Sequence, residues 1–85
     1  MLHVYAASWC PHCTKTSAFL EEHGIAYTWI EIEAQPEEVI EKIIQVNGGD
    51  EWVVPTLEYK GKWREGRFFN EMTLLSDLQA LGVPV

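Results

Sequence analysis

The sequence predicts an α/β fold in which a four-stranded mixed sheet is flanked by helices, with the element order β-α-β-α-β-β-α. An apolar strand, a helix and a second apolar strand open the chain, and this unit requires a parallel strand pair with a right-handed crossover. A Lys-Gly turn later in the chain joins two short strands as a hairpin. Residues 1–85 suffice for a single domain and are too few for two, so all these elements must share one core.

The first part of the chain predicts two strands around a helix. Leu2–Ala6 mixes aliphatic and aromatic residues in a short run, as a buried strand does. Pro11–Glu22 favours a helix, because proline suits the first helical position, and Gly24 is placed to end it. Residues 25–33 are rich in β-branched and aromatic side chains, which predicts the second strand.

A second helix follows this strand. Pro36 opens it, and the two glutamates that come next lie in the first turn, where the helix dipole favours negative charge. Four β-branched residues then recur at helical spacing, namely Val39, Ile40, Ile43 and Ile44. The run Asn47-Gly48-Gly49 ends the helix.

The last part of the chain predicts the hairpin and a third helix. Thr56–Tyr59 and Lys62–Arg64 flank the Lys60-Gly61 turn and are expected to pair. Asn70 is a suitable N-cap for the final helix, which extends to Gly82. We expect three apolar side chains of this helix to face inward: Met72, Leu75 and Leu78.

The charge balance limits the classes of partner. Thirteen acidic and six basic side chains give a net charge of −7, which argues against a nucleic-acid partner. Four basic residues lie close together in the sequence: Lys60, Lys62, Arg64 and Arg67. This cluster predicts either a solvated hairpin edge or a basic rim that attracts an anionic partner. No signal peptide is visible, and no run approaches the roughly 18 apolar residues of a membrane helix. We therefore expect a cytoplasmic monomer without a membrane partner.

The motif that carries chemistry is Cys10-Pro11-His12-Cys13, which follows the first strand and opens the first helix. Two cysteines are rarely a structural disulfide in the cytoplasm, and a C-x-x-C in a βαβ setting is typical of a redox site. Cys10 lies where free N–H groups and the helix dipole stabilise a thiolate. Cys13 lies one turn further in, within reach of that sulfur. We expect Cys10 to attack a substrate disulfide and Cys13 to release the product.

The two residues between the cysteines, Pro11 and His12, are expected to tune the redox couple. His12 is a potential hydrogen-bond donor toward the Cys10 sulfur, which would stabilise the reduced form. A zinc site is the alternative for such a cysteine pair, but it needs about four ligands. Because His3 and His23 show no paired spacing with the cysteines, we predict no metal site.

The second key element is Val54-Pro55, just before a predicted strand. A proline there is unusual, because it cannot donate to the strand ladder. A cis Val54–Pro55 bond would turn the chain tightly beside the cysteines and expose the Val54 backbone to an extended substrate, as in strand addition. An ordinary trans proline at a sheet edge is the alternative.

Four segments together resemble the glutaredoxins in order and spacing, over nearly the whole chain. They are Ser8-Trp9-Cys10-Pro11-His12-Cys13, Gly24-Ile25-Ala26-Tyr27, Glu31-Ile32-Glu33 and Val53-Val54-Pro55-Thr56. Val46-Asn47-Gly48-Gly49 is similar in particular to mycoredoxins and related bacterial glutaredoxin-like proteins. The resemblance implies a thioredoxin-like fold, a cis Val54–Pro55 bond, Cys10 as nucleophile and Cys13 as resolving thiol. It implies a thiol–disulfide oxidoreductase that serves electron transfer and cell redox homeostasis.

The chain departs from the glutaredoxin pattern in three places. It has Ala7 where glutaredoxins usually carry a lysine that binds a carboxylate of glutathione. Residues 63–70 contain one glycine in place of a Gly-Gly-x-Asp type motif, and the Pro-His dipeptide is more typical of periplasmic thiol oxidases. We expect Arg67 to bind an anionic group, and we expect three aromatic residues to line a substrate groove: Trp9, Phe68 and Phe69.

The family resemblance leaves the reductant and the clients open. We expect no tightly bound cofactor, with glutathione or another low-molecular-weight thiol as co-substrate and disulfide-bearing proteins or mixed disulfides as substrates. Thioredoxin reductase is an alternative source of electrons. Two other functions stay open: an iron–sulfur cluster carrier, which Pro11 argues against, and a dedicated electron donor to an enzyme such as ribonucleotide reductase.

Overall fold

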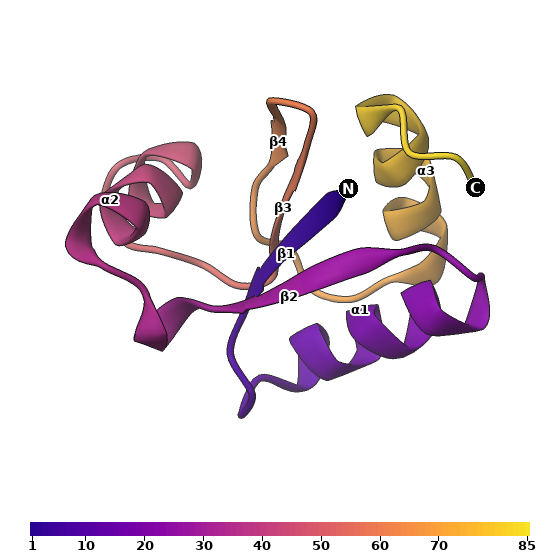
Figure 1. Ribbon diagram of the computed structural model, residues 1–85, viewed down its shortest axis with the longest axis horizontal. Helices are drawn as coiled ribbons and strands as arrows, with labels where there is room; N and C mark the ends of the chain where they lie inside the picture. Colours follow the sequence, from indigo (N-terminus) through magenta and orange to yellow (C-terminus); the bar gives the residue numbers. More distant parts are fainter.

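Four strands form one mixed sheet in the order β2-β1-β3-β4 (Figure 1). The computed structural model describes residues 1–85. The strands are β1 (Leu2–Ala6), β2 (Tyr27–Glu31), β3 (Thr56–Tyr59) and β4 (Lys62–Arg64). β1 pairs in parallel with β2 and antiparallel with β3, which pairs antiparallel with β4. The predicted α/β fold and its element order are therefore confirmed.

Three helices cover the two faces of the sheet. They are α1 (Pro11–Glu22), α2 (Glu37–Val46) and α3 (Glu71–Leu81). Figure 1 shows α1 and α3 together on one side of the sheet and α2 on the other. Two neighbouring residues of β4 reflect this arrangement, because successive strand side chains point to opposite faces. Trp63 lies beneath Lys42 of α2, whereas Arg64 bonds Asp77 of α3.

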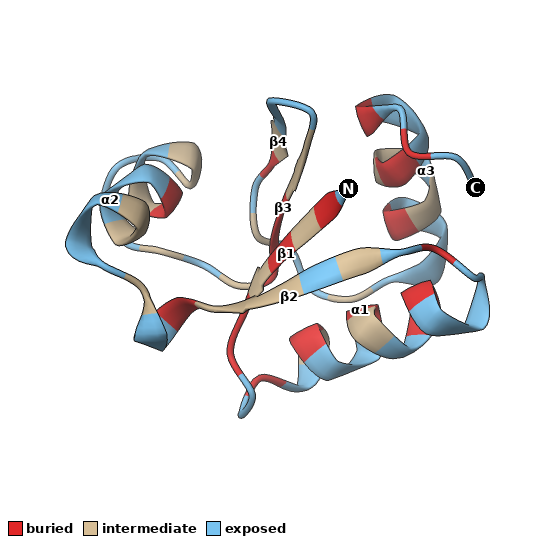
Figure 2. Cartoon of the chain, in the orientation of Figure 1, coloured by how far each residue is buried: buried red, intermediate tan, exposed pale blue.

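The core lies between the sheet and the pair of helices α1 and α3, where buried positions concentrate (Figure 2). Every second residue of β1 is buried, as expected for a strand with one face on the core. The helices contribute Phe19, Leu20, Leu74, Leu78 and Leu81. The last three recur at the i, i+4, i+7 spacing of a helix face, so α3 presents one leucine stripe to the core.

The second strand is shorter than the residues 25–33 predicted for it. β2 covers only the residues opposite the five of β1, because strand pairing ends where its partner ends. Before it, the N–H of Ile25 donates to the carbonyl of Leu20 at 2.9 Å and belongs to the end of α1. After it, Ile32–Ala34 forms a short 3₁₀ helix. In the same region α2 begins at Glu37, with Pro36 as its N-cap.

The prediction that Met72 faces inward is wrong. Its side chain is 84% exposed, whereas Leu78 is buried and Leu75 is half-buried. The stripe that docks on the core begins at Leu74, two residues and about 200° of helical rotation after Met72. The predicted N-cap of this helix is confirmed, because the Asn70 side chain accepts from the Thr73 N–H at 3.0 Å.

The predicted hairpin turn is present between β3 and β4. Lys60 and Gly61 have φ values of 50° and 85°, the pair of positive angles that a two-residue type I′ turn requires. Because this turn matches the twist of the strands, β4 folds back along β3 toward the cysteine end of the sheet. None of the three helices is long and apolar enough to cross a bilayer.

Candidate active site

The two cysteines lie where β1 passes into α1. Cys10 is the N-cap of the helix, and its sulfur accepts the backbone N–H of Cys13 at 3.4 Å. Pro11 occupies the first helical position, where its missing N–H removes no hydrogen bond. The Cys10 N–H donates to the carbonyl of Ala7 at 3.0 Å, which fixes the turn. The sulfur therefore replaces the usual oxygen cap and faces the positive end of the helix dipole.

The two thiols differ in burial, and burial makes the inner one a weak acid. Cys10 is 6% exposed and Cys13 is fully buried behind it. Burial is the main cause that raises the pKa of the Cys13 thiol from 9.0 to about 12, and the charge of Glu31 acts in the same direction. Cys13 therefore keeps its proton at neutral pH. Of the two cysteines, only Cys10 keeps any exposed surface.

The Val54–Pro55 segment forms a wall beside Cys10. The Val54–Pro55 peptide bond is cis, and the Cys10 sulfur lies 3.9 Å from the Val54 carbonyl oxygen. The N–H of Val54 makes no hydrogen bond within the protein. One backbone donor next to the Cys10 sulfur is thus free to pair with an extended chain.

The histidine of the motif faces the loop that precedes α3. Its Nδ1 atom accepts the Phe69 N–H at 3.0 Å, and its ring stacks on Phe68 with centroids 4.8 Å apart. An Nδ1 that accepts a hydrogen bond carries no proton, so the proton of the neutral ring lies on Nε2. The ring thereby holds the 65–70 loop against α1, and the role of His12 in tuning the Cys10 sulfur stays a prediction.

Two of the three expected groove aromatics are exposed. Trp9, which precedes Cys10, is 62% exposed, and Phe68, which stacks on His12, is 81% exposed. Phe69 is half-buried and packs edge-on against Phe19, so it contributes to the core. Trp9 is held by Glu33, whose carboxylate accepts its indole N–H at 2.7 Å.

Comparison with known proteins decides the family. The glutaredoxin family model matches residues 2–63, which include both cysteines and the Val54–Pro55 segment. The chain belongs to the glutaredoxin family. Glutaredoxin 1 of Rickettsia conorii is 40% identical over 50 residues, which is 59% of this chain and 49% of that protein. The chain thus spans about half the length of the curated relatives that it matches.

Solved glutaredoxin structures share the fold. The glutaredoxin (grx-1) of Archaeoglobus fulgidus superposes with a TM-score of 0.68 at 32% identity, over 88% of this chain and 82% of its own. A buckwheat glutaredoxin–glutathione complex superposes with a TM-score of 0.65 at 20% identity. That match covers 95% of this chain and 69% of the buckwheat chain. The thioredoxin-like architecture predicted from the sequence is therefore confirmed for this glutaredoxin.

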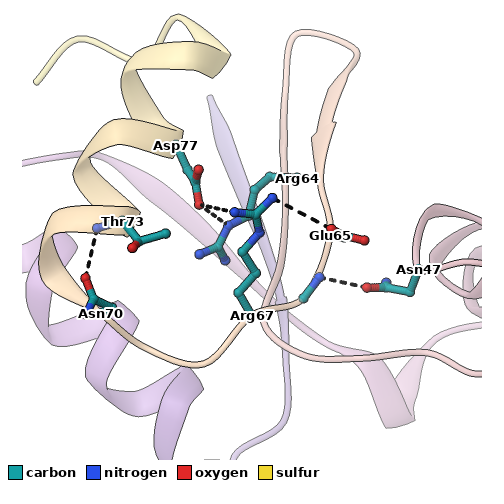
Figure 3. A network of polar contacts seen from close by, with 8 residues as sticks. Asn47, Arg64, Glu65, Arg67, Asn70, Thr73 and Asp77 are labelled. Carbon is teal, nitrogen blue, oxygen red and sulfur yellow. Dashed lines mark hydrogen bonds and ion pairs between the residues drawn. The ribbon is translucent and has the colours of Figure 1, made fainter.

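Two members of the basic cluster of this glutaredoxin, Arg64 and Arg67, lie between β4 and α3 beside Asp77 (Figure 3). The guanidinium of Arg67 lies 3.7 Å from Glu65 and 3.7 Å from Asp77. Arg64 is buried and donates from Nε to Asp77 at 2.8 Å. Both guanidinium groups already face carboxylates, so the structure gives no support to the expected anion-binding role of Arg67.

The charges next to Cys10 are acidic. Ala7 is fully buried, so its position offers no cation to a substrate. Glu31 accepts the Ser8 N–H at 3.3 Å, and Glu33 holds Trp9. A substrate that approaches this glutaredoxin site next to Ser8 and Trp9 therefore meets two carboxylates.

Sequence reasoning missed three residues that support the Val54 wall. From the sequence, Asn47 is assigned to a helix end, Thr56 to a strand and both to family-like segments, but none of the three residues, Asn47, Thr56 and Gly66, is given a role in the site. In the structure the Asn47 amide bonds the Thr56 hydroxyl at 2.9 Å and accepts the Gly66 N–H at 2.7 Å. The available indication was an asparagine, with its two donors and one acceptor, beside the Val-Pro-Thr element.

Proposed function

We propose that this chain is a dithiol reductase, which reduces protein disulfides or mixed disulfides through Cys10 and Cys13. The observation that carries the proposal is the pairing of an N–H-capped sulfur, on a residue with 6% exposure, with a fully buried, protonated thiol one helical turn away. Membership of the glutaredoxin family supports it. A dithiol that donates electrons suits a reducing compartment, so we place the protein in the cytoplasm.

The proposed reaction has two exchange steps. The Cys10 thiolate attacks one sulfur of the substrate disulfide; a Cys10–substrate bond forms, the substrate S–S bond breaks, and the other substrate sulfur leaves as a thiolate. Cys13 gives up its proton, which neutralises the departing thiolate. Its sulfur then attacks the Cys10 sulfur; the Cys10–Cys13 disulfide forms, the Cys10–substrate bond breaks, and the second substrate sulfur leaves as a thiolate that takes a proton from water. Two electrons pass from the dithiol to the substrate.

The substrate is proposed to dock as an extended segment along the Val54 wall. The free Val54 N–H and its carbonyl can pair with a substrate backbone, and the exposed faces of Trp9 and Phe68 can cover it. Glu31 and Glu33 favour neutral or basic residues around the substrate disulfide. Disulfides carried by polypeptides therefore fit this site better than disulfides flanked by acids.

The dithiol must then be regenerated, and we propose glutathione or another low-molecular-weight thiol as reductant. The buckwheat relative crystallised with glutathione supports this choice. The two carboxylates next to Cys10 repel the anionic tripeptide, so glutathione should act with a high KM that falls as salt screens the repulsion. Thioredoxin reductase is the competing electron source.

Turnover of defined peptide disulfides tests the proposed function. Two peptides with one internal disulfide, flanked by lysines or by glutamates, are reduced in the presence of NADPH with either glutathione plus glutathione reductase or thioredoxin reductase. We expect reduction of both peptides, with a preference of about fivefold for the lysine-flanked one at low salt that disappears in about 0.5 M salt. No reduction of either peptide with any electron source contradicts the proposed function.

A further inference from the structure

Two walls near the cysteine motif are joined by one half-buried polar side chain, that of Asn47. The first wall is the Val53–Val54–Pro55 segment, whose carbonyl at Val54 faces the Cys10 sulfur. The second wall is the 65–70 loop, which His12 holds through the Phe69 N–H. Neither segment is part of a helix or strand, so neither has a regular hydrogen-bond ladder of its own. Their positions must be fixed by other contacts.

Asn47 supplies those contacts from the end of α2. Its Nδ2 group donates to the Ile43 carbonyl at 2.8 Å and to the Thr56 hydroxyl at 2.9 Å, and its Oδ1 accepts the Gly66 N–H at 2.7 Å. Both amide hydrogens and the carbonyl are therefore used. Figure 3 shows the Asn47 side chain reaching from α2 to the backbone of the 65–70 loop.

The link from Asn47 to the first wall passes through Thr56. The Thr56 hydroxyl accepts from Asn47 and donates its own hydrogen to the Val53 carbonyl at 2.6 Å. Thr56 is fully buried, so water does not compete for these bonds. The orientation of the peptide unit just before Val54 is thus set by a two-bond relay from Asn47.

The two walls also touch directly at Gly66. A side-chain carbon placed on Gly66 would lie 2.5 Å from Cγ1 and 2.9 Å from the backbone carbonyl carbon of Val53. Only glycine permits this approach. The Gly66 N–H points to Asn47 while its α-carbon packs on Val53, so the asparagine fixes both segments at their point of contact.

We propose that Asn47 is a positioning residue for disulfide exchange: its amide locks the Val53–Pro55 segment and the 65–70 loop together and so holds the Val54 backbone where a substrate strand pairs. The proposal rests on the proposed function, because its consequence is measured on substrate binding. Asn47 touches neither sulfur, so the intrinsic reactivity of Cys10 does not depend on it. Loss of the amide should therefore weaken docking and leave the thiol chemistry intact.

The test compares Asn47→Ala with two variants of its relay partner. Thr56→Val keeps the shape of the side chain without the hydroxyl, and Thr56→Ser keeps the hydroxyl. Ile25→Val is the control, because Ile25 is a buried residue beside Gly24 at the other end of α1. The readouts are KM and kcat for the lysine-flanked peptide disulfide, the rate at which iodoacetamide labels Cys10, and the amide resonance of Val54.

We expect KM to rise about tenfold in Asn47→Ala and Thr56→Val, as one to two lost hydrogen bonds imply. The same two variants should shift the Val54 resonance, whereas Thr56→Ser and Ile25→Val should match the wild type. The Cys10 labelling rate should be unchanged in all four. An unchanged KM in Asn47→Ala, or a labelling rate that falls together with turnover, contradicts the positioning role.

The failures of the two proposals are distinguishable. A wild-type protein that reduces no peptide contradicts the proposed function, and the Val54 resonance then decides whether Asn47 fixes the wall. If the wild-type protein reduces the peptide and the Asn47→Ala variant has the same KM, only the positioning role is contradicted. An equal rise of KM in Ile25→Val also contradicts it, because the effect would then follow from general destabilisation.

Discussion

Replacement of Cys10 by serine is expected to reduce disulfide turnover to the uncatalysed background. The hydroxyl of serine does not ionise near neutral pH and does not attack a disulfide, and of the two cysteines only Cys10 keeps exposed surface. Cys13 does not substitute for it, because that thiol is fully buried and keeps its proton. Turnover of the peptide disulfide in Cys10→Ser, with circular dichroism to verify folding, checks this.

Replacement of Cys13 gives a different expected result and serves as the matched comparison. Cys13→Ser should retain reduction of a mixed disulfide with glutathione, in which free thiol completes the reaction. It should lose reduction of an internal peptide disulfide and accumulate a Cys10–peptide adduct visible by mass spectrometry. Cys13→Ala repeats the test without a buried hydroxyl. Full activity of Cys10→Ser, or loss of both reactions in Cys13→Ala, would contradict the assigned roles.

Removal of Asp77 is expected to cost about 3–5 kcal/mol of unfolding free energy, the loss typical of a buried ion pair that loses one partner. Arg64 is only 5% exposed, and its Nε bonds Asp77 at 2.8 Å. Burial lowers the pKa of Arg64 while Asp77 raises it, so the carboxylate offsets the burial of the charge. Without it the guanidinium remains buried between β4 and α3. Urea unfolding of Asp77→Ala measures the loss.

Two variants define what that result means. Arg67→Ala removes the longer, half-exposed contact to the same carboxylate, and we expect it to cost less than about 1 kcal/mol. The double variant Arg64→Met with Asp77→Leu replaces the pair by apolar side chains and should recover most of the stability that Asp77→Ala loses. If the unfolding free energy of Asp77→Ala is as high as that of Arg67→Ala, the buried pair does not anchor α3.

Local patterns sufficed for most of the fold. Proline at the start of α1 and the Lys60-Gly61 turn are backbone requirements that depend on neighbouring residues, so the bounds of α1, β3 and β4 were predicted correctly. The limits of β2 depend on the length of β1, which its own apolar run does not encode. Helix α3 carries apolar residues on more than one side, and its docking on the core decides which side is buried. Met72 is therefore exposed although its local sequence is apolar.

The candidate site was predictable only in part, for a related reason. A spacing of three residues at a helix start brings the Cys10 sulfur to the Cys13 N–H whatever the rest of the chain does. The partner of His12 is the backbone of Phe69, a contact that depends on how the 65–70 loop packs. The bonds of Asn47 to Thr56 and Gly66 likewise join segments that are distant in the sequence. Long-range contacts of this kind produce no periodic pattern in the sequence from which they could be predicted.

The difference in reactivity between the Cys10 and Cys13 thiols can be measured directly by competitive labelling. The reduced, folded protein is treated at neutral pH with less than one equivalent of iodoacetamide, and the labelled peptides are quantified by mass spectrometry. We predict label on Cys10 almost alone, because Cys13 is fully buried and its pKa is raised to about 12. Equal labelling of both cysteines in the folded protein, or label mainly on Cys13, would contradict the account.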